Sequence, residues 1–399
     1  MEPFIKKLRI VNYKSIADLT IENIGPFAVF AGANGSGKSN IFEALEFVNH
    51  VVRFGIKEAL RLHGGWANIH NFRLEEDKNK IFEFEIVVKS EAPGVHLNNR
   101  QLQPEDYPEQ RYYLRLEDLD NDTPQRFETY WQNGEEALHF EHGKLFLPNV
   151  LGKEARSRVV EDIGHSILLY SQSMNSTLGN LLYYSFNPEA ARQLTREQFD
   201  NSLLDKQGRN LAAVLSRLES DSSISDSIIE LMQLFVPSLE SVKTETNSLD
   251  GRSGLQFIEE GLSRPFPPHL ISDGTLHALN ILVALFQRKN AIPLMGTNWT
   301  LIEEPERGLH PYAVQELTSI IREAATSLNA NSVGVKKFQP FWLTTHSATL
   351  VRACWPGELW FVEKMNGCTT VRKAEPHPQS RLPLDEAWLS NALEGGLPW

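Results

Sequence analysis

Residues 32–39 read GANGSGKS and fit the phosphate-binding pattern G-x-x-x-x-G-K-[ST]. The apolar stretch Phe27–Ala31 precedes them, and apolar residues recur at helical spacing from Ile41 to Val48. Between a strand and a helix, such glycines turn backbone N–H groups toward an anion, and the helix N-terminus adds its dipole. Lys38 would supply a point charge and Ser39 a ligand to magnesium. The residues expected to hold the nucleotide are Asn34, Gly35, Gly37, Lys38, Ser39 and Asn40.

A second segment whose residues could do chemistry is 300–306, TLIEEPE, an apolar strand that ends in carboxylates. Phosphoryl-transfer sites handle magnesium and the attacking water at such a strand end. Glu303 would serve the metal, and Glu304 would orient the water and accept its proton. The alternative is that these acids are only the solvated end of a strand, and the segment alone does not decide between the two.

Two further segments could complete a nucleotide site. In 270–279, LISDGTLHAL, small and polar residues stand before an apolar helix, so free N–H groups there could bind a phosphate. Ser272 and Gly274 would permit close approach, although an ordinary helix cap is the simpler interpretation. Residues 341–345 indicate a strand that delivers His346, which could donate a hydrogen bond to a γ-phosphate and sense its loss. A single histidine at a strand end is usually structural.

Composition limits the class of protein. The 399 residues are 41% hydrophobic and 23% charged, which is typical of a globular chain. The first residues lack a secretory segment and no apolar run reaches membrane-spanning length, so we expect a soluble, cytoplasmic protein without a membrane partner. The net charge of −12 opposes nonspecific binding to DNA, which would need a local basic patch.

The pattern along the chain predicts the order of its elements. Alternating residues at 5–13 and 16–21 predict an antiparallel pair, and strand-rich segments at 81–88, 112–116 and 127–131 should extend that layer. The stretch 152–237 is mostly helical in pattern, clearest at 210–215 and 228–232, and 181–186 within it reads as a core strand leaving the nucleotide-binding sheet. No heptad array occurs, so we expect no long coiled coil.

In this order, the four chemical segments resemble the ATP-binding cassette superfamily. The closer resemblance is to the SMC/RecF-like branch of stand-alone prokaryotic ATPases, through NYKS at 12–15, LISDGT at 270–275, EPERGLHP at 304–311 and TTHS at 344–347. The resemblance implies an α/β fold, an ABC-type P-loop ATPase head with an N-terminal antiparallel β layer and a mostly helical insertion. The expected parts are an N-terminal lobe (1–75), an inserted region (76–260) and a C-terminal lobe (261–399).

The resemblance also implies how the site is assembled. ATP and Mg²⁺ are the expected cofactors of a head-to-tail homodimer, in which Ser272 and Gly274 of one subunit complete the site of the other. Glu304 and His346 would be its catalytic residues. This chain departs from the family in having Glu303 where Asp is usual, which could slow hydrolysis. It also lacks a clear glutamine in the magnesium-sensing loop that follows the first helix in the family, where Asn68, His70 or Asn71 could substitute.

Members of the branch act with nucleases or other effectors, some of them fused as a TOPRIM domain. The tail at 347–399 is too short for such a domain and has no metal-carboxylate cluster, so we expect a separate effector such as an HNH or TOPRIM nuclease. The leading hypothesis is an ATP-driven sensor or scaffold in antiphage defence or DNA maintenance. The alternatives are a non-hydrolysing scaffold switched by ATP, a transporter nucleotide-binding subunit and, last, a small-molecule kinase.

Overall fold

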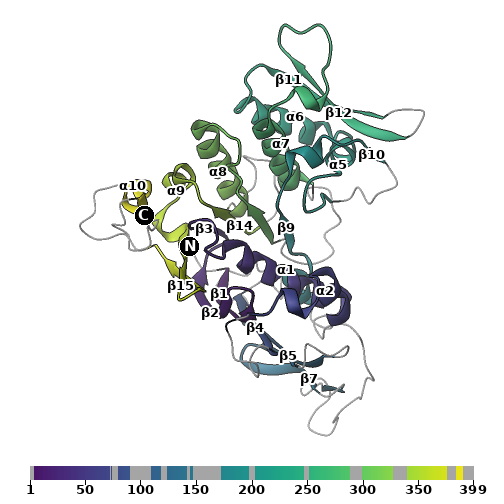
Figure 1. Cartoon of the computed structure of the whole chain (residues 1–399). Helices are drawn as coiled ribbons and strands as arrows, with labels where there is room; N and C mark the ends of the chain where they lie inside the picture. The colour runs from purple at the N-terminus through teal and green to yellow at the C-terminus, as the bar shows by residue number, and fades with distance from the viewer. Residues whose placement is uncertain are drawn as a thin grey trace, which may run out of the picture.

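A computed structural model shows the fold, in which the described residues form three β-sheets with helices packed around them (Figure 1). It describes residues 4–71, 73, 80–89, 109–117, 124–141, 144–146, 172–196, 203–246, 251–287, 299–326, 339–374 and 383–389.

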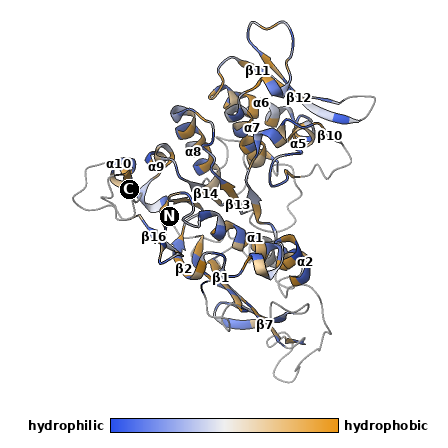
Figure 2. Ribbon diagram, viewed as in Figure 1, coloured by the Kyte–Doolittle hydropathy of each residue, from blue (hydrophilic) through white to orange (hydrophobic). Residues whose placement is uncertain are grey.

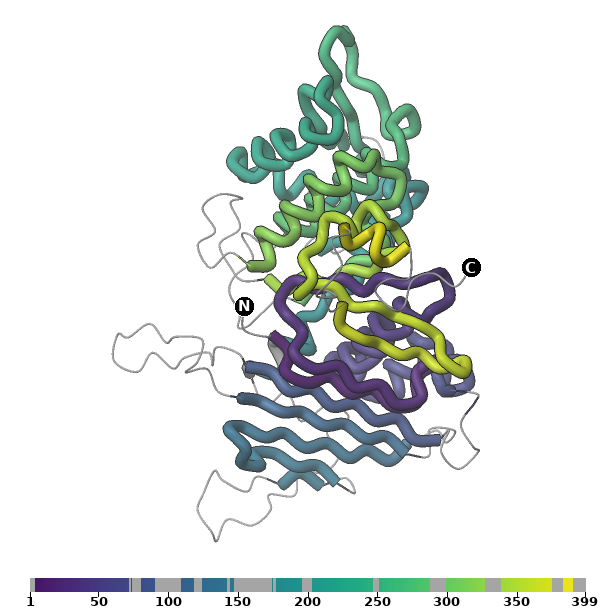
Figure 3. Tube along the Cα trace, turned by 90° about the vertical axis from the view of Figure 1, so that its left-hand side faces the viewer, coloured from purple at the N-terminus to yellow at the C-terminus, as the bar shows by residue number. Residues whose placement is uncertain are grey.

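The largest sheet is antiparallel and runs in the order β2-β1-β4-β5-β6-β7-β8. Side chains along β1 alternate between buried and partly exposed, as expected for a sheet with one face in the core. The predicted antiparallel pair is formed by β1 and β2. The later strands extend the same sheet from β4 onward, as predicted, and Figure 3 shows these strands side by side. The strands are β1 (Ile5–Tyr13), β2 (Ile16–Ile24), β4 (Phe82–Lys89), β5 (Glu109–Glu117), β6 (Gln125–Gln132), β7 (Glu135–Glu141) and β8 (Lys144–Phe146).

The second sheet has the order β16-β15-β3-β14-β13-β9 and is parallel except for its edge strand β16. Its central strands β3 and β14 are buried along their whole length, which explains their continuous apolar sequences. The expected strand at 181–186 appears as β9, paired with β13. The strands are β3 (Phe27–Ala31), β9 (Leu182–Tyr184), β13 (Thr300–Glu303), β14 (Phe341–Thr345), β15 (Leu359–Met365) and β16 (Cys368–Lys373).

Helices dominate the described part of 152–237, as predicted, and 147–171 and 197–202 lie outside the described residues. A small sheet of β10 (Thr195–Arg196), β12 (Arg252–Glu259) and β11 (Leu239–Thr246) lies beside them. The helices are α1 (Lys38–Phe54), α2 (Ile56–Leu62), α3 (Gln172–Gly179), α4 (Pro188–Ala191), α5 (Leu211–Leu218), α6 (Ser222–Gln233), α7 (Asp273–Phe286), α8 (Pro311–Thr326), α9 (Ala348–Ala353) and α10 (Leu384–Leu389). Short 3-10 turns span Trp66–Asn68, Pro268–Leu270 and Pro356–Glu358.

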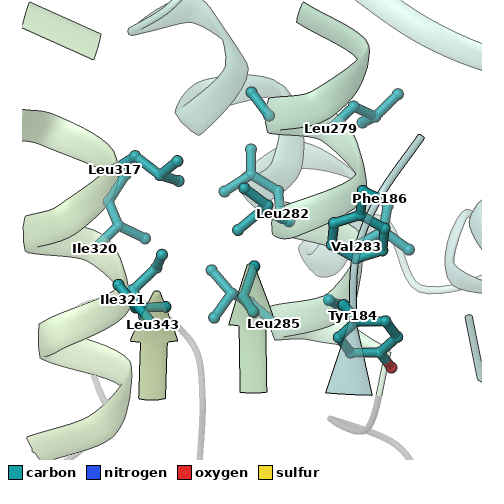
Figure 4. Close-up of a cluster of buried hydrophobic side chains, with 14 of the residues drawn as sticks. Tyr184, Phe186, Leu279, Leu282, Val283, Leu285, Leu317, Ile320, Ile321 and Leu343 are labelled. Carbon is teal, nitrogen blue, oxygen red and sulfur yellow. The ribbon is translucent and has the colours of Figure 1, made fainter. Parts of the chain in front are cut away.

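The parallel sheet separates two hydrophobic cores. Successive side chains of a strand point to opposite faces, so Val29 of β3 joins the core with α7 and α8, while Phe30 joins the core with α1 and the antiparallel sheet. Figure 4 shows Leu282 of α7 and Leu317 of α8 pointing toward each other on the face of the sheet where Leu343 of β14 lies, and Figure 2 shows the apolar character of β13 and β14. Layers on both faces hold the ends of the parallel strands in fixed positions.

Candidate active site

The phosphate loop connects β3 to α1, as the sequence predicted. Gly37 caps α1 with a φ of 101°, and Gly35 has a φ of 78°. Both are in the left-handed region that favours glycine. Asn34 and Gly35 are exposed at the tip of the loop, and Ser39 is exposed in the first turn of α1. The loop therefore presents the residues expected to meet a nucleotide.

A network of hydroxyl groups braces the loop from two sides. Ser15, in the turn between β1 and β2, lies 2.6 Å from the Thr369 hydroxyl of the β15–β16 hairpin, and Thr369 Oγ1 donates to the Ser36 carbonyl at 3.0 Å. A Cβ at Gly37 would lie 1.9 Å from Thr369 Oγ1. Asn40 Nδ2 donates to Ser15 at 2.6 Å, so this side chain holds the loop in place. Sequence reasoning assigned no role to Thr369, because no local pattern marks a contact across the whole chain.

Lys38 is folded back onto its own loop. Its Nζ donates to the carbonyls of Gly32 and Ala33, at 2.8 and 2.9 Å, and the residue is buried. Burial lowers the pKa of the ammonium group, while the charges of Glu304, Glu306 and Glu303 act in the opposite direction. The three carboxylates of the acidic segment at 300–306 therefore act electrostatically on Lys38, whose hydrogen bonds are to its own loop.

Three predicted segments, namely the phosphate loop, the acidic segment and the strand that delivers His346, meet at the carboxyl edge of the parallel sheet. Strand β14 lies between β3 and β13, and the backbone bonds Gly32 N to Thr345 O (3.2 Å) and Glu304 N to Thr344 O (3.0 Å) join the strand ends. His346 Nδ1 lies 3.0 Å from Glu304 Oε1. Ligands of open α/β sheets bind at this edge, and the phosphate loop, the acidic segment and the histidine share it.

The adjoining carboxylates differ in their surroundings. Glu303 Oε1 is buried and accepts no hydrogen bond within the described ranges. Burial, followed by the nearby charge of Glu303, raises the pKa of the Tyr183 hydroxyl. Glu306 is buried and accepts a hydrogen bond from Thr345 Oγ1 at 2.5 Å, and burial raises its pKa. Sequence reasoning gave Glu306 no role.

The unpaired oxygen of Glu303 suits a cation. Magnesium is usually held by one or two carboxylates together with substrate phosphates and water, rather than by an all-protein cage. In the part of the chain that the structure describes, no group of three or more His, Cys, Asp or Glu side chains could hold a metal by itself. Glu303 and Ser39 are thus suitable ligands for magnesium brought with a nucleotide.

The expected second helix N-terminus is the start of α7. Ser272 is its exposed N-cap and accepts a hydrogen bond from Thr275 N at 3.1 Å. Arg192 Nη2 donates a hydrogen bond to Asp273 Oδ1 at 2.6 Å and so holds the start of the helix in place. A Cβ at Gly274 would lie 2.0 Å from the carbonyl oxygen of Gly308, so the glycine is needed for packing within the chain.

The three candidates for the magnesium-sensing loop make hydrogen bonds to other residues of the chain. Asn68 Nδ2 donates to Gly64 O at 2.7 Å, and His70 Nδ1 lies 3.0 Å from Trp66 O. Asn71 is buried, and its backbone N–H donates to Asn12 Oδ1 at 2.8 Å. Its Nδ2 has no hydrogen-bond partner among the described residues. None of these contacts places one of the three side chains against Glu303 or Ser39.

The chain belongs to the family described as "AAA domain, putative AbiEii toxin, Type IV TA system", which matches residues 27–352. A comparison with solved structures finds the Smc head domain with an extended coiled coil, bound to the C-terminal domain of ScpA, from Pyrococcus furiosus. That likeness has a TM-score of 0.54 at 16% identity and covers 96% of this chain and 98% of the other. An uncharacterized protein of Methanocaldococcus jannaschii is 54% identical over 43 residues, which are 11% of this chain and 13% of that protein.

These comparisons confirm the resemblance to SMC-type heads and the α/β fold class. The chain is a P-loop ATPase by family, and its mixed α/β fold resembles that of the Smc head domain. Among the described helices, none combines the length and the apolar composition of a membrane span.

Proposed function

We propose that this chain binds ATP with Mg²⁺ at the phosphate loop and hydrolyses it, and that it does so as a head-to-tail homodimer. The observation that carries the proposal is the contact of Glu304 with His346 at the strand edge that also begins the phosphate loop. Glu304, the proposed proton acceptor, then lies beside His346, the candidate sensor of the γ-phosphate, at the edge where the loop that carries the buried Lys38 begins.

Each residue has a defined part in the proposed reaction. Lys38 would exchange its two carbonyl partners for nucleotide phosphates, and backbone N–H groups of the loop would contact the same phosphates. Ser39 and Glu303 would hold magnesium, which neutralises phosphate charge when bound. Glu304 orients the attacking water and accepts its proton, and His346 fixes the carboxylate from the side.

The dimer is proposed because the start of α7 is turned to solvent. Ser272 is exposed, and its side chain bonds within its own helix turn. Free N–H groups at such a helix end suit a phosphate. A second subunit with its nucleotide facing Ser272 would complete both sites. In this arrangement residues 1–75 and 261–399 are the two ATPase lobes, and 76–260 is inserted between them.

We further propose that the dimer is a cytoplasmic sensor or scaffold that gates a separate effector, such as an HNH or TOPRIM nuclease, in antiphage defence or DNA maintenance. The family description, which names a toxin and a type IV toxin–antitoxin system, supports the defence setting. A second candidate is a scaffold that binds ATP without turning it over. Glu303 favours it, because a longer side chain than the usual Asp moves the carboxylate outward.

Phosphate release by the purified protein, with and without DNA, tests these proposals while light scattering follows mass. Turnover and an ATP-dependent doubling of mass are expected, and stimulation by DNA would indicate DNA sensing. Assembly without turnover would select the scaffold. Neither assembly nor turnover would refute both. Lys57→Ala, on the exposed side of α2, is a control that should behave as the parent.

A further inference from the structure

His277 connects the helix that begins at Ser272 to the backbone of Glu304. It lies in the second turn of α7 and is 1% exposed. Its Nε2 atom lies 3.1 Å from the Glu304 carbonyl oxygen, and the ring of Phe186 packs against it edge to face. The imidazole is therefore held between α7 and the acidic segment.

The chemistry of the contact fixes the state of the ring. Burial lowers the pKa of His277 to about 4, so the imidazole is neutral near pH 7 and one ring nitrogen carries hydrogen. A carbonyl oxygen only accepts, so that hydrogen is on Nε2. Nδ1 is buried with no hydrogen-bond partner in the described part of the chain. An unpaired buried acceptor costs free energy, which the fold tolerates in order to keep this donor in place.

The backbone that receives the bond is unusual. Glu304 has a φ of 45°, in the left-handed region that a glutamate seldom adopts. Its N–H donates to Thr344 O at 3.0 Å, and its carbonyl also accepts from Arg307 N at 3.0 Å. Strand β14, the following turn and α7 therefore hold one residue from three directions. Such strain persists where the surroundings determine it, and it clusters at functional sites.

A second contact sets the position of α7 against the same turn. The missing side chain of Gly274 lets the Gly308 carbonyl approach so closely that a Cβ would be 2.0 Å away. Gly274 and His277 are three residues apart and thus lie on one side of the helix. Both ends of the turn from Glu304 to Gly308 consequently contact the first two turns of α7.

We propose that His277 is a positioning residue for ATP hydrolysis, which holds the backbone of Glu304 so that its carboxylate stays beside His346. The consequence for turnover rests on the function proposed above. The anchoring itself does not, because the hydrogen bond is a property of the chain without nucleotide.

Three variants test the proposal. His277→Leu removes the donor and keeps an apolar side chain in the pocket, whereas His277→Gln offers an amide N–H. Leu282→Ala, in the same buried helix (Figure 4), is the control for general destabilisation. Turnover, ATP binding and thermal stability are measured for each, together with hydrogen exchange of the peptide that contains residues 304–309.

His277→Leu should lower kcat by about 10- to 100-fold, the cost of a small misplacement, with ATP affinity retained. His277→Gln should recover much of that loss. The 304–309 amides should exchange faster in His277→Leu than in His277→Gln or Leu282→Ala. Unchanged kcat in His277→Leu, or an equal loss in Leu282→Ala, would overturn the positioning role.

A parent protein without turnover would refute the ATPase proposal alone. The exchange experiment would still decide the inference about His277. Equal exchange of the 304–309 amides in the three variants would overturn the anchoring, and selective acceleration in His277→Leu would support it.

Discussion

Replacing Glu304 by Gln separates the chemistry of this carboxylate from its packing. The side chain is 36% exposed, and its Oε1 lies 3.0 Å from His346 Nδ1. The amide oxygen of Gln can accept the same hydrogen bond, and the backbone bond to Thr344 does not involve the side chain. Shape and fold should therefore be kept, while the ability to accept a proton from water is lost.

The expected magnitudes follow from that geometry. General-base catalysis contributes about 10²- to 10⁴-fold, so the barrier should rise by about 2.7 to 5.5 kcal/mol. The free energy of unfolding should change by less than about 0.5 kcal/mol, because the site is partly exposed and loses no buried contact. ATP should still bind, and the dimer should persist because its nucleotide is not consumed.

Single-turnover phosphate release with excess protein measures the barrier. Light scattering measures the persistence of the dimer, and thermal unfolding measures stability. Glu316→Gln on α8 is a matched control with the same change of charge. Hydrolysis of ATP by Glu304→Gln at the parental rate would refute the assignment of Glu304 as base. A loss of ATP binding would instead place the carboxylate in nucleotide binding.

Three other variants test separate parts of the site. Lys38→Ala should weaken ATP binding by about 1.5 to 3 kcal/mol or more, the size of one charge-assisted hydrogen bond. Calorimetric titration measures the affinity, with Lys57→Ala as the control. Parental affinity would exclude Lys38 from the site. Ser272→Arg should prevent ATP-dependent dimerisation and leave binding by the monomer, whereas Ser222→Arg at the exposed start of α6 should do neither; dimers of Ser272→Arg would place the interface elsewhere. Glu306→Gln should raise thermal stability at pH 8. Burial raises the pKa of Glu306 in the folded state, so the parent protein loses stability as the pH rises from the pKa of the unfolded state toward the higher pKa of the folded state. The difference from the parent should vanish below pH 4, and a difference independent of pH would contradict that reasoning.

The sequence was sufficient for features that local pattern controls. The buried strands β3, β13 and β14 are short and largely apolar, and the first antiparallel strands alternate, so these elements could be predicted, whereas β15 and β16 were not. The resemblance to the ATP-binding cassette superfamily also implied that Lys38, Glu304 and His346 belong to one ATP site. The structure brings Glu304 and His346 together at the carboxyl edge of the parallel sheet, where the loop that carries Lys38 also begins.

Contacts between distant segments could not be predicted in the same way. Thr369 supports the phosphate loop from a hairpin more than 300 residues away, and nothing in its neighbours indicates this. His277 was part of a recognised segment, but its role depends on the direction of one buried ring. That direction is set by the packing of α7 against the acidic segment, which is a property of the assembled core.

Gly274 shows how one residue can satisfy two physical demands. Sequence reasoning explained it by the close approach of a partner's phosphate, and the structure adds an approach within the chain, to the Gly308 carbonyl. Any side chain at 274 would disturb the packing of α7 on the acidic segment before a partner arrived. Loss of activity in Gly274→Ala would therefore say nothing about the dimer. Ser272 is exposed, and its side-chain bonds to described residues are within its own turn, so a change there affects the surface offered to a second subunit. The composite site must accordingly be tested at Ser272.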